Sequence, residues 1–213
     1  MIKNNKIKFI ISSIIILLPM LFGIIVSDKL PNKIATHWNF NGEVDGWSSK
    51  NFVIFFIPLF LLALHITGMI ITSLDKKSNN QNKKILNIIF FICPAVSLFA
   101  GGFSYAHALG YQPQVALFAP IFLGFVFILI GNYLPKTTQN KYMGIKIKWT
   151  LENEKNWNAT HRFGGKLWVI GGIILILSAL LPTLASMITM FSLIIALVLT
   201  PIIYSYVYSR KHK

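Results

Sequence analysis

The sequence predicts an all-α integral membrane protein with six transmembrane helices, cytoplasmic N and C termini, a short extracellular β-hairpin loop and a cytoplasmic amphipathic loop. Hydrophobic residues make up 54% of the chain and charged residues only 12%, whereas a soluble domain carries about 25% charged residues. The apolar residues gather in six long runs, and most basic residues lie between them. This pattern is typical of a chain that buries its apolar surface in lipid.

Each apolar run is long enough to cross a hydrocarbon core, which takes about 20 helical residues. The first run follows Lys3, Lys6 and Lys8, but it is long for a signal peptide and no small-residue cleavage site follows it, so we expect a retained helix. The stretch Leu167–Tyr208 is too long for one span, so we expect a helical hairpin with its turn at Pro182–Ser186. The predicted spans cover residues 9–27, 52–74, 86–109, 114–133, 167–183 and 187–208.

The positions of the basic residues predict the orientation of these spans. Seventeen of the 20 Lys and Arg residues lie at the two termini and in the second and fourth loops. The other loops hold only Lys29, Lys33 and Lys50. Loops rich in Lys and Arg stay on the cytoplasmic side, so the net charge of +14 indicates topology and contact with anionic lipid rather than binding of nucleic acid.

The first outer loop, Asp28–Asn51, is expected to form a β-hairpin. Asn41-Gly42 is a two-residue turn signal because both residues tolerate positive φ. A turn there would pair Phe40 with Glu43 and Trp38 with Asp45. Trp38 and Phe40 would then share one face, and we expect that face to rest on the membrane surface or on the helix ends.

Further contacts are expected beside this turn. Asp45-Gly46 indicates a second turn, and Ser48 or Ser49 could cap the second helix. His37 could form an acid–base pair with Asp45 or Glu43, or the same contact could simply stabilise the hairpin.

The fourth loop contains the longest polar interruption in the second half of the chain, Asn140–Trp168. Apolar and basic residues alternate over Gly144–Trp149, which predicts an extended segment. Thr150 is the expected N-cap of a short interfacial helix that would end at Gly164-Gly165.

Two faces of that predicted helix differ in character. Trp157 and His161 are four residues apart and share one face. Glu154, Asn158 and Arg162 share another. Arg162 could bind an acidic group of a partner through its forked guanidinium, or it could tie the loop to itself.

Small residues within the spans predict close helix packing. Gly102, Ala106 and Gly110 recur every four residues, and Gly171-Gly172 lie in the fifth span. Such residues let membrane helices approach closely.

The sequence offers little sign of catalysis. The five histidines show no metal-ligand spacing, and no nucleotide-binding, kinase or hydrolase motif is present, so we expect no catalytic residue, metal or cofactor. The single cysteine, Cys93, is expected to be a small residue that faces lipid or a neighbouring helix. His65 and His107 lie inside apolar runs, where an ionisable group is a functional hypothesis; we interpret both as structural, with a functional role as the alternative. No Asp, Glu, Lys or Arg lies inside any run, which argues against an ion-coupled transporter.

Two long motifs resemble a known family. The run LPNKIATHWNFNGEVDGW resembles a small domain of unknown function (DUF1648) at the start of many Gram-positive membrane proteins, and NKYMGIKIKWTLENEKNWNATHRFGGKLWVIGG resembles the signature of the SdpI immunity family. The resemblance implies three parts: residues 9–74 as the DUF1648-like unit, residues 75–113 around the third span, and residues 114–208 as the SdpI-like unit with its signature loop at residues 134–166. The matching outer residues are Pro31, His37, Trp38, Gly42, Asp45, Gly46 and Trp47, and the matching inner residues are Asn140, Gly144, Lys146, Trp149, Thr150, Trp157, His161 and Arg162.

The resemblance implies a multi-pass immunity protein of the bacterial plasma membrane that gives resistance to a secreted, membrane-active peptide toxin. It also implies a receptor role, in which a winged-helix transcriptional repressor is captured at the inner face without direct binding of nucleic acid. The alternative is a small transporter or an intramembrane enzyme that acts on lipid or peptide. The expected toxin-binding residues are His37, Trp38, Phe40, Asp45 and Trp47. The expected partner-binding residues are Lys146, Trp149, Thr150, Glu154, Trp157, Asn158, His161 and Arg162.

Overall fold

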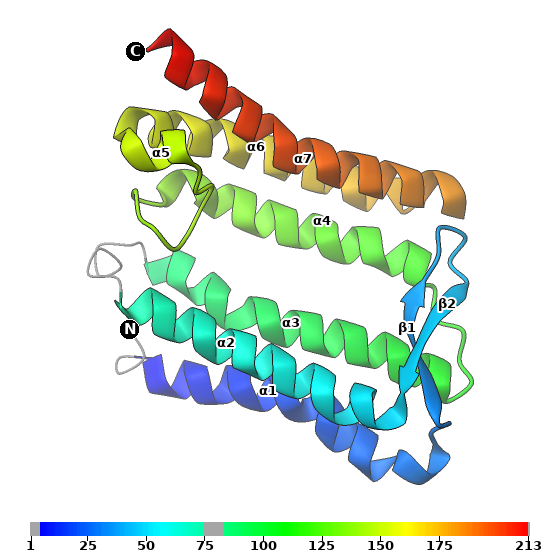
Figure 1. Cartoon of the computed structure of the whole chain (residues 1–213). Helices are drawn as coiled ribbons and strands as arrows, with labels where there is room; N and C mark the ends of the chain where they lie inside the picture. The colour runs from blue at the N-terminus through cyan, green and yellow to red at the C-terminus, as the bar shows by residue number, and fades with distance from the viewer. Residues whose placement is uncertain (1–4, 75–82, 213) are drawn as a thin grey trace. The chain divides into compact units, whose positions relative to one another are not determined.

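The structure, a computed structural model, describes residues 5–74 and 83–212. The chain divides into two compact units, each described on its own below: Met1–Ile70 with Ile89–Val115, and Ile71–Ile88 with Ala116–Lys213. The part of the chain that the structure describes contains six helices long and apolar enough to cross a membrane, as the sequence predicts. They are α1 (Lys6–Ile25), α2 (Ile57–Leu74), α3 (Lys83–Ala108), α4 (Val115–Tyr133), α6 (Glu154–Ser178) and α7 (Thr183–Lys211) (Figure 1). These six helices indicate a multi-pass membrane protein.

In the first unit, α1 and α3 are held together by small residues and one hydroxyl. Gly101 of α3 lies against Pro19 of α1, where a Cβ atom would come within 2.7 Å of the proline Cβ. One turn earlier on α3, the Ser97 hydroxyl donates a hydrogen bond of 2.8 Å to the carbonyl of Ile16. Pro19 therefore lies in the contact between the two helices.

The prediction that Gly102 and Gly110 let α3 pack closely against another helix is wrong. A Cβ atom on Gly102 would meet nothing within 4 Å, and Gly110 lies beyond α3 with φ +91°. The residue that permits close packing is Gly101, because it faces α1 whereas Gly102 points into open space.

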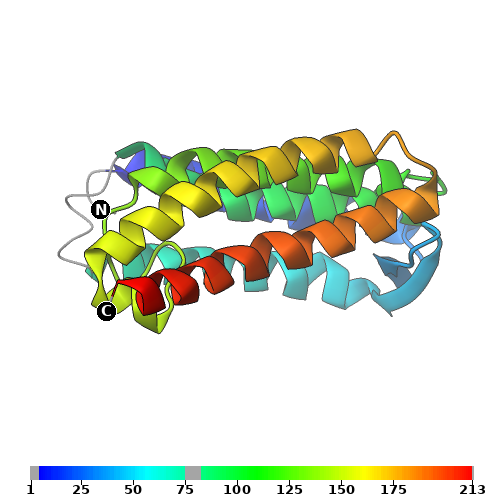
Figure 2. The ribbon, with the colours of Figure 1, turned by 90° about the horizontal axis from the view of Figure 1, so that it is seen from above.

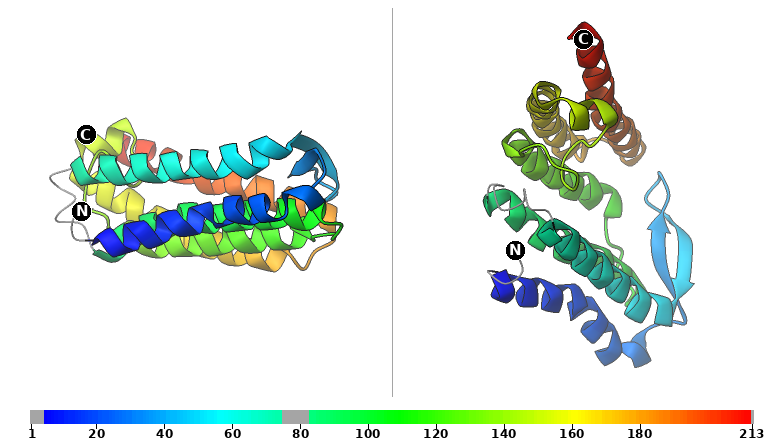
Figure 3. Two further views of the ribbon diagram at one scale, coloured as in Figure 1. Left: turned by 90° about the horizontal axis from the view of Figure 1, so that it is seen from below. Right: turned by 60° about the vertical axis from the view of Figure 1, so that its left-hand side comes forward.

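A two-stranded antiparallel hairpin, β1 (Lys33–Trp38) and β2 (Val44–Ser49), joins α1 to α2. It lies where α1 ends, α2 begins and α3 ends (Figures 1 and 3). Ile34 is fully buried in a core cluster with Leu30, Val53, Ile54 and Tyr105. The hairpin is therefore anchored by apolar packing, which an isolated hairpin lacks.

The predicted register of this hairpin is wrong. Trp38 pairs with Val44 rather than Asp45, and Phe40 lies in the connecting loop rather than in a strand. Asn39 explains the difference, because its side-chain oxygen accepts hydrogen bonds from the backbone N–H groups of Asn41 and Glu43, at 2.9 and 3.0 Å. This Asx-type bracing builds a longer loop than the Asn-Gly turn alone would.

The second predicted turn, at Asp45-Gly46, is also wrong. Both residues lie within β2, at an irregularity in the strand register. A side chain at Gly46 would collide with the Cβ atom of His37 at 2.6 Å, so this glycine permits close strand pairing. The predicted cap of the second helix is confirmed for Ser49, whose hydroxyl accepts a hydrogen bond of 3.3 Å from the N–H of Phe52. A π-helical turn, Phe52–Phe56, then leads into α2.

In the second unit, α4 and α6 meet along four glycines, which we call the glycine seam: Gly124 and Gly131 of α4, and Gly165 and Gly172 of α6. A Cβ atom on Gly124 would lie 2.6 Å from the carbonyl oxygen of Gly172, and one on Gly131 would lie 2.9 Å from that of Gly165. The two glycines of each helix are seven residues apart, so both face the partner helix. The packing role predicted for Gly171-Gly172 is confirmed, since Gly171 also lies against Leu197 of α7.

The glycine seam also corrects the predicted helix boundary. Gly164-Gly165 does not end a short helix, because α6 continues through it from Glu154 to Ser178. The expected N-cap is wrong as well: Asn153 caps α6 by accepting a hydrogen bond of 3.0 Å from Asn156 N–H, whereas Thr150 lies in a separate short helix, α5 (Lys148–Glu152). The predicted extended segment accordingly ends at Ile147.

The expected helical hairpin at the end of the chain is confirmed. The turn between α6 and α7 covers residues 179–182, slightly earlier than predicted (Figure 2). The two helices pack through a core cluster of Leu175, Met187, Met190 and Leu197. Trp168 of α6 adds a hydrogen bond of 2.8 Å to the carbonyl of Leu197.

Candidate functional site

The first candidate site is the aromatic surface of the hairpin, formed by Trp38, Phe40 and Trp47. The two tryptophans pack against His107 at the end of α3. The Trp38 ring meets the His107 ring edge to face at 6.4 Å, and the Trp47 ring lies 5.6 Å from it. The expectation that the hairpin aromatics rest on a helix end is confirmed for these two tryptophans. Phe40 and Trp47 remain 49% and 51% exposed, so the surface offers apolar area to a ligand.

A polar pair lies beside this aromatic surface. The Nδ1 atom of His37 is 2.5 Å from Oδ1 of Asp45, and both side chains are exposed. Glu43 instead accepts a hydrogen bond of 3.2 Å from the side chain of Asn39. The structure therefore selects Asp45 as the partner of His37 and places this pair across the two strands.

The second candidate site is a buried cluster in the second unit, built around Trp157 and His161 of α6. The two rings stack with centroids 4.0 Å apart, which confirms that they share one helix face. The Trp157 indole donates a hydrogen bond of 2.8 Å to the carbonyl of Thr137. His161 donates from Nδ1 to the carbonyl of Trp157 at 2.8 Å and accepts at Nε2 from the N–H of Ile145 at 3.0 Å. This arrangement requires the neutral imidazole with its proton on Nδ1.

Gly144 allows the loop to approach these rings. Its φ is +106°, a conformation that favours glycine. A Cβ atom at this position would collide with Nε2 of His161 and would lie 3.1 Å from the Trp157 ring. The signature glycine is thus needed both for its backbone conformation and for its lack of a side chain.

Thr150 joins the extended segment to α5. Its hydroxyl accepts a hydrogen bond of 3.1 Å from Ile147 N–H and lies 2.7 Å from the carbonyl of Ile145. Gln139 holds the same turn from the other side by donating to the carbonyl of Thr150 at 2.8 Å. Asn140 braces the loop, since its side-chain oxygen accepts from the N–H of Met143 at 2.7 Å.

The structure separates the predicted partner-binding residues into two groups. Thr150, Trp157 and His161 are buried and hold the loop on α6. Trp149 is partly buried against the ring of Tyr206. The remaining four are exposed: Lys146, Glu154, Asn158 and Arg162.

The exposed residues of α6 have little to hold them within the chain. In the described part of the chain, the side chains of Glu154, Asn158 and Arg162 make no hydrogen bond or ion pair. Lys146 donates a hydrogen bond of 3.1 Å to the carbonyl of Tyr142. Among the described residues, Arg162 therefore does not tie the loop to itself.

Sequence reasoning missed a polar connection between α6 and α7. Asn156 is fully buried, and its amide nitrogen donates a hydrogen bond of 3.0 Å to the carbonyl of Ser205. Its side-chain oxygen accepts from the hydroxyls of Ser205 and Thr160, at 2.9 and 2.8 Å. The available signal was Ser205 itself, a polar residue inside an otherwise apolar run.

The two histidines inside spans both have packing partners. The Nε2 atom of His65 forms a hydrogen bond of 2.8 Å with the Ser12 hydroxyl, and the His65 ring stacks on Phe9. His107 supports the hairpin aromatics, as described above. Among the described residues, no group of three His, Cys, Asp or Glu side chains is placed to hold a metal ion.

Comparison with known proteins identifies two matching families and a similar immunity protein, but no matching solved structure. Residues 136–205 match the SdpI/YfhL protein family, and residues 14–62 match a domain of unknown function, DUF1648. The chain is 31% identical over 212 residues to the immunity protein SdpI of Bacillus subtilis (strain 168), covering 96% of this chain and 97% of that protein. No solved structure matches the chain.

Proposed function

This chain belongs to the SdpI/YfhL protein family, and from that premise we propose that it gives its host resistance to a secreted, membrane-active peptide toxin. The single observation that carries the proposal is the near full-length similarity to an immunity protein, which extends over both the outer motif and the signature loop. The relative is named as an immunity protein and not as an enzyme.

The proposed topology follows from the basic residues and the six helices. With both termini and residues 134–166 in the cytoplasm, the loops rich in Lys and Arg lie inside. The β-hairpin then lies outside, where a secreted peptide arrives. A labelling experiment tests this arrangement in a Cys93→Ser background, with one new cysteine at Asn41 or at Asn158. We expect an impermeant thiol reagent to label N41C in intact cells and N158C only after permeabilisation; the reverse pattern would contradict the topology.

The hairpin surface is the proposed site of toxin recognition. It combines exposed aromatic area, in Phe40 and Trp47, with the polar His37–Asp45 pair. Aromatic side chains with a polar handle suit contact at a membrane surface, where a membrane-active peptide has both apolar and polar groups.

The exposed face of α6 is the proposed site for a cytoplasmic partner. Glu154, Asn158 and Arg162 lie at spacings of four residues on one face and make no contact within the described chain that would occupy them. Arg162 suits bidentate binding of a carboxylate. The buried residues Trp157, His161 and Thr150 would hold this face in place, and a winged-helix repressor is the proposed partner.

A binding experiment tests the proposal. The probe, hereafter the killing peptide, is the peptide purified from the culture supernatant of the host strain by its killing of sensitive Gram-positive cells. We expect saturable binding to wild-type protein in lipid nanodiscs, at least tenfold weaker binding to Trp47→Ala, and unchanged binding to Arg162→Ala. Absence of binding above that of empty nanodiscs would overturn the proposed function. Equal loss in both variants would contradict recognition at the hairpin.

A further inference from the structure

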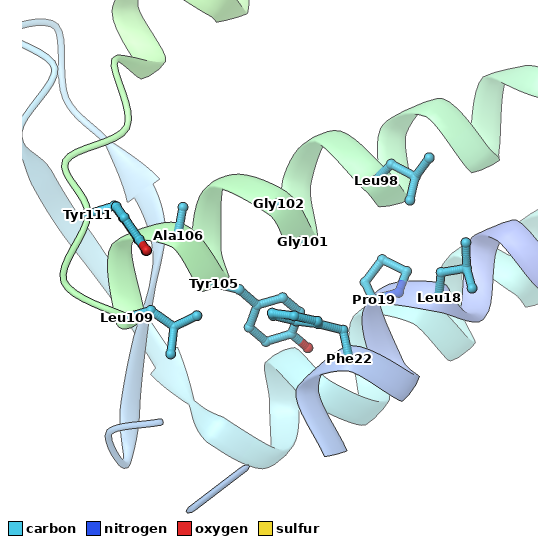
Figure 4. A pocket seen from close by; sticks show the side chains of 10 residues that line it. All are labelled: Leu18, Pro19, Phe22, Leu98, Gly101, Gly102, Tyr105, Ala106, Leu109 and Tyr111. Carbon is cyan, nitrogen blue, oxygen red and sulfur yellow. The ribbon is translucent and has the colours of Figure 1, made fainter. Parts of the chain in front are cut away.

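The ends of α1 and α3 surround a cavity of about 410 Å³ within the first unit (Figure 4). Leu18, Pro19 and Phe22 line it from α1, and Gly102, Tyr105 and Ala106 line it from α3. The volume falls within the range of about 300–1,000 Å³ that is usual for ligand pockets. The cavity is therefore large enough for a substantial apolar group.

We propose that this cavity takes an apolar side chain of the killing peptide, while a peptide backbone carbonyl accepts a hydrogen bond from the Tyr105 hydroxyl. The inference rests on the proposed function and names the part of the protein that receives the toxin. Three features of the cavity support it: its open wall, its position near the hairpin, and the buried hydroxyl of Tyr105.

The α3 wall of the cavity is open because its residues are small. A Cβ atom added to Gly102 would meet nothing within 4 Å, in contrast to its neighbour Gly101, which lies against Pro19. Across the cavity, Leu18 and Phe22 of α1 are 43% and 44% exposed. A ligand that packs against these side chains gains van der Waals contacts with them.

The cavity adjoins the aromatic surface of the hairpin. Ala106 lines the cavity, and the next residue, His107, contacts the rings of Trp38 and Trp47. A peptide that lies against Trp47 therefore has the cavity within reach of a neighbouring side chain. The two features therefore lie near the same end of α3.

The Tyr105 hydroxyl favours a peptide as the occupant over a lipid hydrocarbon chain. Tyr105 is 3% exposed, and its hydroxyl has no hydrogen-bond partner among the described residues. Buried polar groups without a partner are uncommon. The hydroxyl lies against Gly23 of α1, where an added Cβ atom would collide with it, and the exposed Phe22 ring lies 5.5 Å from the Tyr105 ring. The proposed hydrogen bond therefore requires Phe22 and this end of α1 to move aside when the peptide binds. A peptide offers a carbonyl acceptor at every residue, and a hydrocarbon chain offers none.

A matched pair of glycine substitutions tests the cavity. Gly102→Leu fills the cavity without a collision at its Cβ atom, and Gly68→Leu in α2 makes the same change at a helical glycine that also has open space and does not line the cavity. We expect Gly102→Leu in nanodiscs to bind the killing peptide about tenfold more weakly or worse, since the contact area of one buried side chain is lost. Gly68→Leu should bind like wild type.

A second variant tests the polar contact. Tyr105→Phe removes a hydroxyl that has no partner among the described residues, so the thermal unfolding temperature should not fall. Loss of one hydrogen bond to the peptide should weaken binding about two- to tenfold. Unchanged binding to Tyr105→Phe would refute the assigned role of the hydroxyl.

The outcomes separate this inference from the proposed function. If wild-type protein does not bind the killing peptide, the proposed function fails and the inference fails with it. If wild type and Gly102→Leu bind equally well, the cavity assignment is wrong while the proposed function stands. If Gly102→Leu keeps full binding but loses a lipid that copurifies with wild type, the occupant is an acyl chain, and the inference is overturned.

Discussion

The Nε2 atom of His161 accepts a hydrogen bond of 3.0 Å from the backbone N–H of Ile145. This contact joins the signature loop to α6 across sixteen positions of sequence, and it forms because Gly144 leaves room for the imidazole. The buried signature residues His161, Trp157 and Thr150 thus form one structural unit, against which the exposed Gly144 packs. Their motif encodes the shape of the loop, whereas the exposed face of α6 carries the proposed partner site.

Loss of the His161 imidazole should destabilise the second unit. His161→Phe keeps an aromatic ring beside Trp157 but leaves Ile145 N–H and the Trp157 carbonyl without their side-chain partner. We expect a loss of about 1–3 kcal/mol, because a buried polar group is left unpaired. Thermal unfolding of the detergent-solubilised protein measures it, with exposed Arg162→Ala as the control that should shift little. Equal unfolding temperatures for His161→Phe and wild type would disprove the role of this contact.

Gly144→Ala should be more harmful than an ordinary glycine substitution. The residue has φ +106°, and its new methyl group would collide with His161. We expect a loss of at least about 1–2 kcal/mol from the backbone conformation alone. Gly68→Ala is the control, since its methyl group has free space in α2 and alanine favours helix over glycine. A Gly144→Ala protein as stable as Gly68→Ala would contradict the observed loop conformation.

The glycine seam should not accept larger side chains. Gly172→Leu would place a side chain against the carbonyl of Gly124 and against Ile128, so α4 and α6 would have to separate. We expect little folded protein after extraction from the membrane, measured by size-exclusion chromatography. Gly102→Leu, which meets open space, should elute like wild type. Normal elution of Gly172→Leu would show that the two helices do not pack at this position.

Two nearby asparagines should differ sharply in their contribution to stability. Asn156→Ala removes the three hydrogen bonds of the Asn156 side chain, to the Ser205 carbonyl, the Ser205 hydroxyl and the Thr160 hydroxyl. The Ser205 carbonyl then lacks its side-chain donor. Asn158→Ala changes an exposed side chain that makes no hydrogen bond in the described chain. We expect a loss of about 2–4 kcal/mol for Asn156→Ala and less than about 0.5 kcal/mol for Asn158→Ala. Chemical unfolding in mild detergent checks both, and similar losses would argue against the α6–α7 connection.

The sequence was sufficient to predict the six helices because the signal for a membrane span is strong. Each span needs about 20 apolar residues, and few other structures place so many together. The stacking of Trp157 on His161 was likewise predictable from their spacing, since residues four apart share a helix face. These features depend on local sequence alone.

The predictions of local structure failed where the same residues are compatible with two local structures, and tertiary contacts determine which one forms. Asn41-Gly42 favours a two-residue turn, but the side chain of Asn39 binds two backbone N–H groups and extends the loop. Gly164-Gly165 favours a helix end, but Gly165 allows α6 to pass close to Gly131 of α4. Neither hydrogen-bond geometry nor the packing partner can be read from the residues themselves.

The sequence was sufficient to locate the candidate sites along the chain, but not to assign the role of each residue in them. The motif of the signature loop named Thr150, Trp157 and His161, and only the structure shows that they are buried. The cavity beside Tyr105 depends on contact between α1 and α3, which are far apart in sequence. No local pattern marks such a site, because its walls are ordinary apolar residues.

Survival of sensitive cells tests the central claim most directly. A Gram-positive strain without an immunity gene, carrying either this chain or an empty vector, is exposed to increasing concentrations of the killing peptide. The account predicts that cells with the chain survive concentrations at least tenfold higher than those that kill the control cells. Equal killing of both strains, with the protein shown to be present in the membrane, would contradict the assignment of this chain as an immunity protein.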